Sequence, residues 1–164
     1  MEEFMISPPA VILYVAGAVL VVAVAGIAAT KGSFARKGIR MGIVVLLLAA
    51  VLSYFYRPVT ITVDEDGLAI SGVGGAELGW EQVTSAVYVP DLRTSPYRPT
   101  VRTRGFALGE YRSGRFLLST GEAARVIMEQ SRHAVVVRTA ERVYVLGPRN
   151  AERLAAAVDR HRVY

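Results

Sequence analysis

Two long apolar runs near the start of the chain constrain its fold more than any other feature. The first, residues 10–30, reads AVILYVAGAVLVVAVAGIAAT and has 21 residues without a charge. An α-helix rises 1.5 Å per residue, so about 20 such residues cross a bilayer core of about 30 Å. The second run, residues 41–56, is shorter, and Ile39 with snorkelling Arg40 and Arg57 extends it. The pattern predicts a two-helix transmembrane hairpin with spans at 10–30 and 40–56.

A cleaved signal peptide and a buried core hairpin are the alternatives to this anchor. A signal peptide opens with basic residues and has a shorter apolar core, whereas this chain opens with Glu2 and Glu3. A buried hairpin of this hydrophobicity needs a larger covering domain than the 108 residues that follow it. We therefore expect an integral, multi-pass protein of a cytoplasmic membrane, with the bilayer as a partner and an N-terminal tail at residues 1–9.

The charges that flank the two runs predict the orientation of the anchor. The basic link at residues 31–39, with Arg40 beside it, holds four basic residues and no acid, whereas the tail holds no basic residue. Loops rich in Lys and Arg stay in the cytoplasm. The soluble domain at residues 57–164 is therefore expected to be extracytoplasmic.

The remaining composition narrows the class of ligand. The chain has no cysteine, which excludes disulfides, thiolate metal sites and a cysteine nucleophile. Its net charge is +5, but from Arg57 onward 15 arginines stand against 12 acidic residues, a surplus of only three. Part of the positive charge therefore belongs to the basic link, and we expect no nucleic-acid partner.

From Val59 onward the apolar period changes to that of β-strands. Val59, Ile61 and Val63 alternate with polar residues, and the acidic turn at 64–67 leads into a returning strand, which predicts a hairpin. Further short strands are expected in order along the chain, ending in an amphipathic helix led by Pro148. The expected strands are 83–89, 115–118, 124–128, 134–138 and 142–146.

The stretch 102–158, which reads RTRGFALGEYRSGRFLLSTGEAARVIMEQSRHAVVVRTAERVYVLGPRNAERLAAAV, resembles the bacterial pleckstrin-homology-like (PH-like) domain. The matching positions include Gly105, Gly109 and Gly114, and Trp80 just before a strand is also similar to the family. The resemblance covers about residues 59–160. It implies a mostly β PH-like domain of two packed antiparallel sheets with a C-terminal capping helix. It implies little about the ligand, because such folds serve lipids, peptides and self-assembly alike.

No residue pattern in the chain predicts catalysis, a metal site or a cofactor. His133 and His161 read as ordinary edge or surface residues, and the acidic run 64–66 alternates in direction at a turn, so its carboxylates do not converge on one ion. The glycines at 105, 109 and 114 precede a strand, whereas a phosphate-binding loop precedes a helix. We expect no enzyme activity, no metal and no cofactor, although a site formed only in space stays open.

An arginine-rich segment is the best candidate contact for a ligand or partner. Arginine forks bind phosphate and carboxylate groups with two parallel hydrogen bonds. A basic rim around an apolar tip at 106–108 suits an anionic headgroup. The alternative is a loop that arginine merely keeps soluble. The candidate contact residues are Arg93, Arg98, Arg102, Arg104, Phe106, Leu108, Arg112 and Arg115.

Two functions follow from these observations. The first is a non-enzymatic interaction or assembly module of the bacterial cell envelope, which pairs with itself or with another membrane protein through a sheet edge or the glycine-rich segment. The second is a domain that binds an anionic lipid headgroup or another small anion through the arginine-rich segment. A hydrolase or transferase is a third class that no motif supports.

Overall fold

The computed structural model describes residues 1–29, 34–55, 58–72, 75–130 and 132–162. The chain divides into two compact units. One unit joins residues 1–7 to residues 58–164, and the other contains residues 8–57. Residues that the sequence pattern treated as a tail therefore belong to the β-rich unit.

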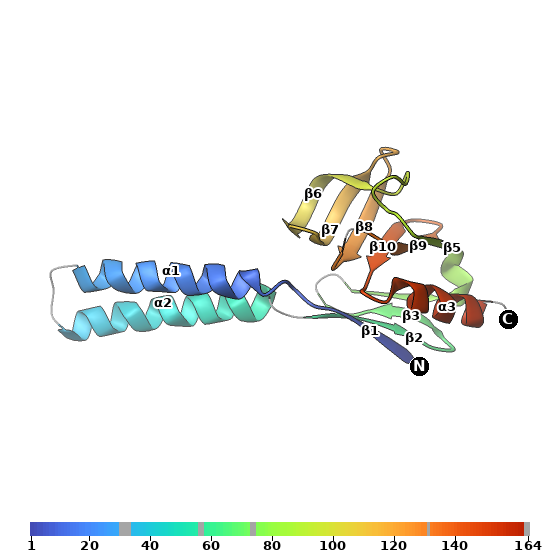
Figure 1. Cartoon of the computed structure of the whole chain (residues 1–164). Helices are drawn as coiled ribbons and strands as arrows, with labels where there is room; N and C mark the ends of the chain where they lie inside the picture. The colour runs from blue at the N-terminus through green and yellow to red at the C-terminus, as the bar shows by residue number, and fades with distance from the viewer. Residues whose placement is uncertain (30–33, 56–57, 73–74, 131, 163–164) are drawn as a thin grey trace. The chain divides into compact units, whose positions relative to one another are not determined.

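The helical unit is a pair of helices, α1 (Val11–Ala29) and α2 (Phe34–Phe55), that pack along each other (Figure 1). Many of their apolar side chains are exposed, including Tyr14, Val22 and Leu46.

The predicted membrane anchor is corrected by this structure. In the part of the chain that is described, no helix combines the length and the apolar composition needed to cross a membrane. The first turns of α2 carry Arg36, Lys37 and Arg40, so its apolar part begins only at Met41. The predicted transmembrane hairpin and the two-span localisation in a cytoplasmic membrane are therefore wrong, and the prediction of an extracytoplasmic soluble domain, which rested on those spans, loses its basis.

A four-stranded antiparallel sheet forms one layer of the β-rich unit. Its strands lie in the order β1 (Glu2–Ile6), β2 (Val59–Val63), β3 (Gly67–Ile70) and β4 (Ala76–Gly79). The predicted hairpin of β2 and β3 is confirmed, and Asp64 shapes its turn because Oδ1 accepts the backbone N–H groups of Asp66 and Gly67, each at 3.1 Å.

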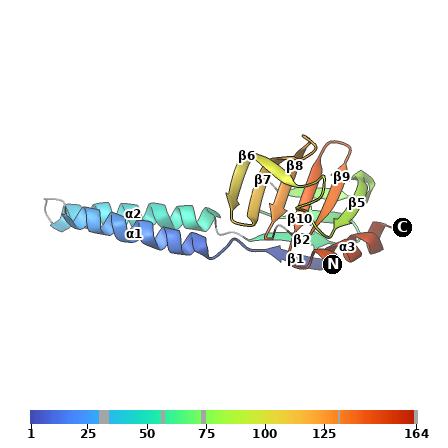
Figure 2. The ribbon, with the colours of Figure 1, turned by 45° about the horizontal axis from the view of Figure 1, so that its top comes forward.

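A six-stranded sheet forms the second layer of the β-rich unit, and Figure 2 shows this layer from a second side. Its spatial order is β5-β9-β10-β8-β7-β6. The strands are β5 (Val83–Val89), β6 (Pro99–Leu108), β7 (Tyr111–Leu118), β8 (Ala123–Met128), β9 (Ala134–Thr139) and β10 (Val143–Gly147). A 3-10 turn, η1 (Trp80–Gln82), leads into β5.

One pair of strands departs from the antiparallel arrangement that was expected. After the β9–β10 hairpin the chain places β10 between β9 and β8, so β10 runs parallel to β8. The prediction of two purely antiparallel sheets is wrong at this pair. The chain runs along β9 in the direction opposite to β8, and β10, which pairs antiparallel with β9, therefore runs in the same direction as β8.

The closing helix α3 (Ala151–Arg162) packs against β5 and β9 of one sheet and β2 of the other (Figure 1). Its apolar residues Leu154, Ala157 and Val158 join a core cluster with inward residues of both sheets. We call the side of the six-stranded sheet that meets this core its inner face. A second cluster, around Phe116, Val126 and Val136, covers the outer face of the same sheet. Strands β9 and β10 are therefore buried on both faces.

Candidate functional site

The arginine-rich segment forms an edge of the six-stranded sheet and the loop before it. Three prolines within residues 90–104 indicate a long loop or an irregular edge. In the structure residues 99–108 form the edge strand β6, which has β7 as its sheet neighbour. The pairing of β6 with β7 shifts register twice, between Pro99 and Val101 and between Arg102 and Arg104. Irregularities of this kind bend an edge strand and change which face its side chains occupy.

The register of β6 and β7 divides the predicted arginines between two faces. Arg104 lies opposite Arg115, and alternation along β7 places Arg115 on the same inner face as Tyr111. Arg102 lies opposite Phe116, which belongs to the outer cluster. The same alternation assigns Arg112 to the outer face. The register therefore places the predicted contact residues on two faces of the hairpin rather than on one.

A third arginine, Arg125, extends the inner pair across the sheet. Arg115 lies opposite Arg125 on β8, and Arg125 lies opposite Tyr144 on β10. We call Arg104, Arg115 and Arg125 the arginine row. Arg104 and Arg115 are exposed, whereas Arg125 is half-buried. Arg142 lies two residues before Tyr144, diagonal to Arg125, and its charge reaches that guanidinium.

The electrostatics of the row are those of a site with excess positive charge. None of the six described strands of this sheet carries an aspartate or glutamate. Burial lowers the pKa of Arg125, as do the charges of Arg115 and Arg142, while Tyr144 acts in the opposite direction. Among the residues that the structure describes, neither Arg104 nor Arg115 lies within ion-pair distance of a carboxylate.

A cross-strand glycine pair holds the first two members of the row together. Gly105 lies opposite Gly114, with φ angles of 111° and 146°. A Cβ on Gly105 would lie 2.3 Å from the Ser113 carbonyl oxygen, and one on Gly114 would lie 2.2 Å from the Arg104 carbonyl oxygen. Only glycine fits this close approach, which sets the neighbouring residues Arg104 and Arg115 side by side.

The other predicted contact residues have structural surroundings. Arg93 pairs with Glu110 at 3.1 Å, and both side chains are more than half exposed. The backbone of Arg98 bonds to Ser95 and Ser119. The apolar tip is not an exposed one, because residues 106–108 are half-buried. Phe106 contacts the ring of Tyr111 with 6.1 Å between centroids.

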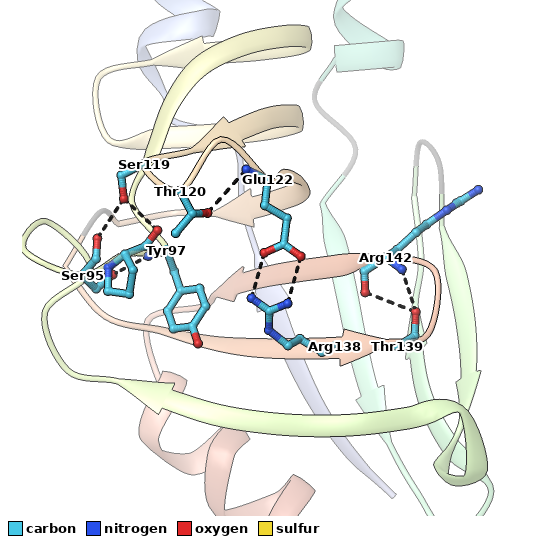
Figure 3. Close-up of polar contacts among 9 residues, drawn as sticks. Ser95, Tyr97, Ser119, Thr120, Glu122, Arg138, Thr139 and Arg142 are labelled. Carbon is cyan, nitrogen blue, oxygen red and sulfur yellow. Dashed lines mark hydrogen bonds and ion pairs between the residues drawn. The ribbon is translucent and has the colours of Figure 1, made fainter.

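The loop at 90–98 closes over the outer face of the sheet (Figure 3). Leu92 is almost completely buried there, and Tyr97 packs beside it on the outer cluster. The Arg138 guanidinium lies 5.6 Å from the centre of the Tyr97 ring and donates two hydrogen bonds to Glu122, at 2.9 and 2.8 Å. The loop at 90–98 therefore completes the apolar cluster on the outer face of the sheet.

No group of three or more His, Asp or Glu side chains that could hold a metal ion occurs among the described residues. His133 lies 3.2 Å from the Arg149 carbonyl oxygen, and His161 stacks on Trp80 with 6.1 Å between ring centroids. Both contacts stabilise the fold and offer no pair of groups arranged for proton transfer.

Two packed sheets with a C-terminal helix across them define a PH-like domain, a class whose members generally act as binding modules. The match to the family confirms the resemblance seen in the sequence. The chain belongs to the bacterial PH domain family, whose model matches residues 59–162. No curated protein and no solved structure matches the chain.

Proposed function

We propose that this chain is a non-enzymatic binding module whose arginine row holds the phosphate groups of an anionic ligand. The observation that carries the proposal is the register that sets Arg104, Arg115 and Arg125 side by side on three neighbouring strands. Neighbouring strands lie about 4.8 Å apart, so the row spans about 10 Å. Like charges directly opposite each other destabilise a sheet, and a bound anion offsets that repulsion.

The chemistry of the row suits specific binding of a phosphate group better than attraction of a diffuse layer of counterions. A guanidinium group offers two parallel N–H donors to a phosphate oxygen pair and keeps its charge at physiological pH. Arg125 is half-buried, where hydrogen bonds to a charged group are stronger than in open water. The exposed Arg104 and Arg115 leave the ligand a route of access.

The two faces of the same hairpin provide the test. The variant R104Q/R115Q removes two charges from the row, and R102Q/R112Q removes two charges from the opposite face of the same strands. With inorganic pyrophosphate as the soluble probe and the full chain in a calorimeter, we expect R104Q/R115Q to lose affinity about 100-fold. Each lost charged hydrogen bond contributes about 1.5 kcal/mol, and 1.4 kcal/mol is a factor of ten. R102Q/R112Q should bind within about threefold of the unaltered chain.

Vesicles distinguish the two sources of phosphate. We would measure the binding of the unaltered chain and of both double variants to vesicles that contain phosphatidylglycerol and to vesicles of phosphatidylcholine alone. Binding to the first with no binding of pyrophosphate assigns the row to a lipid headgroup, and the reverse assigns it to a soluble phosphate compound. In both cases rising salt weakens binding because it screens exposed charges. An equal loss in both double variants, or no binding of any probe, would contradict the proposal.

Assembly is the second candidate function, and an open sheet edge favours it. Strand β1 ends the four-stranded sheet with β2 as its one strand neighbour in the described part of the chain. Exposed backbone donors and acceptors on such an edge pair readily with another strand. Crosslinking of the full chain, followed by measurement of the mass of the product, tests whether it associates with itself.

A further inference from the structure

The two sheets have differently protected edges. On β6, Pro99 opens the strand, arginines follow, and two register shifts interrupt the pairing with β7. Proline, charges and bulges are the devices by which proteins prevent edge-to-edge pairing. On β1 the register with β2 runs without interruption from Glu2 to Ile6, and the strand contains no proline; its two charged residues, Glu2 and Glu3, are both at its start. The β1 edge therefore lacks the proline and the register shifts that interrupt the β6 edge.

A groove runs beside the β1 edge. Its volume is about 320 Å³, and it is lined on one wall by residues 2–5 of β1. The other wall consists of residues 148–150 and Arg153, at the start of α3. Four consecutive residues of one strand include side chains of both faces, so the groove follows the edge of the strand rather than one face of the sheet.

The two walls of the groove carry opposite charges. Glu2 and Glu3 lie on the strand, and Arg149 and Arg153 lie on the helix side. Glu2 is bonded to Arg160, and Arg149 is bonded to Glu129 at 2.7 Å. In the described ranges neither Glu3 nor Arg153 takes part in an ion pair, and both are exposed.

We infer that the groove accepts the β1 strand of a second copy of this chain, which adds to β1 in the antiparallel direction. This inference rests on the assembly function proposed above and is independent of anion binding. An incoming β1 brings its own acidic residues to the basic wall, so Glu3 of the second copy meets Arg153. A two-fold axis repeats the contact in both directions, and such isologous pairs are the commonest arrangement of soluble oligomers.

The size of the contact sets the strength of the association. A five-residue strand that adds to an edge covers much less than the roughly 1,200 Å² of a stable interface. We therefore expect a weak dimer whose population rises with concentration, in the micromolar range or above. The sedimentation of the full chain should accordingly depend on its concentration.

A charge exchange across the groove tests the assignment. Because both residues are exposed, E3R and R153E leave the fold intact. Each variant alone places like charges opposite each other, and we expect the dissociation constant of the dimer to rise about tenfold or more. The double variant E3R/R153E restores opposite charges and should dimerise like the unaltered chain. The matched control is E77R, because Glu77 is an exposed acid on β4 of the same sheet.

A disulfide provides a second readout that is specific to β1. The chain has no cysteine, and Met5 is 60% exposed beside the groove. The proposed pair has its two-fold axis beside Met5, which places the two Met5 residues opposite each other. Under mild oxidation, M5C should therefore form a covalent dimer and E77C should remain monomeric, because a disulfide needs Cα atoms within about 7 Å. A chain that stays monomeric at all concentrations overturns self-association. A dimer whose dissociation constant is unchanged by E3R and R153E, or that M5C does not trap as a covalent dimer, assembles through another surface. That result overturns the assignment to the groove but not self-association itself.

Discussion

The glycine pair between β6 and β7 yields the sharpest test of the fold. Replacing Gly105 with alanine adds a Cβ that meets the Ser113 carbonyl oxygen at 2.3 Å and the Cα of Gly114 at 2.6 Å. These contacts are with backbone atoms, which cannot rotate away as a flexible side chain can. The φ of 111° is also one that side chains rarely adopt. The substitution must therefore push β6 away from β7.

The expected magnitude has two parts. A residue held in this region of backbone space costs about 1–3 kcal/mol. Forcing the strands apart adds a comparable amount, since an overpacked contact costs about 1–3 kcal/mol. We expect G105A to lower the free energy of unfolding by about 3 kcal/mol. For a domain of this size, about 4 °C per kcal/mol gives a fall in Tm of about 12 °C.

The assay is thermal unfolding followed through Trp80, the one tryptophan of the chain, which packs on the core of the β-rich unit. The matched control is G109A at the tip of the same hairpin, where φ is 60° and a new Cβ meets nothing within 4 Å. G109A should lower the free energy of unfolding by only about 1 kcal/mol, which is the cost of the backbone strain. If G105A and G109A unfold at the same temperature, the close approach does not constrain the hairpin and the reasoning fails.

Three further predictions concern the loop, its ion pair and a buried phenol. L92A should lower the free energy of unfolding, measured in urea, by about 2–5 kcal/mol, because it leaves a cavity where a side chain that is only 1% exposed was packed. T94A, at an exposed position of the same loop, should be nearly neutral. R138K keeps the charge but loses the two-pronged contact with Glu122, and we expect a loss of about 1 kcal/mol or less, since both side chains are about one-third exposed. Burial raises the pKa of Tyr111, as does the charge of Glu129, against a lowering effect of Ser113. The stability that this group contributes is therefore complete below pH 10 and is lost as the pH rises through the folded-state pKa. Urea unfolding between pH 9 and 12 should show a smaller loss in Y111F, and an equal loss would contradict this assignment.

Local patterns predicted the elements whose residues lie close together in sequence. The alternation of Val59, Ile61 and Val63 located β2, and the acidic turn located its hairpin with β3. The expected strands at 83–89, 124–128 and 134–138 correspond to β5, β8 and β9 within a residue or two at each end. Periodicity works here because each strand has to present one apolar face to a core.

Elements that depend on distant partners were not predictable in this way. The five residues of β1 are too few for a pattern, and their partner β2 begins at Val59, across the whole helical unit. The prolines in residues 90–104 indicated a long loop or an irregular edge without separating the two, and Pro99 is the first residue of the edge strand β6, where a missing N–H is tolerated. The helical runs were assigned correctly as helices but not as membrane spans.

The candidate site was only partly visible in the sequence. Clustering along the chain selected Arg104 and Arg115 together with Arg102 and Arg112, which the register places on the opposite face. Arg125 was missed because it stands ten residues beyond the cluster and joins the row only through the pairing of β7 with β8. One signal could have found it: Arg125 is the one charged residue inside an otherwise apolar strand.

The route of the chain through the four-stranded sheet has a mechanical consequence. Residues 8–57 interrupt what would otherwise be a simple hairpin, and Ile6 and Val59, on either side of the interruption, are register partners. Both connections thus leave from the same end of the β1–β2 ladder. Tension that draws Ser7 away from Pro58 loads the hydrogen bonds of one residue pair at a time, beginning at Ile6 and Val59. Antiparallel strands that are loaded in this way separate at a lower force than strands whose hydrogen bonds are all loaded together. A force that separates the start of α1 from the end of α2 would accordingly release β1 before it disturbs the six-stranded sheet.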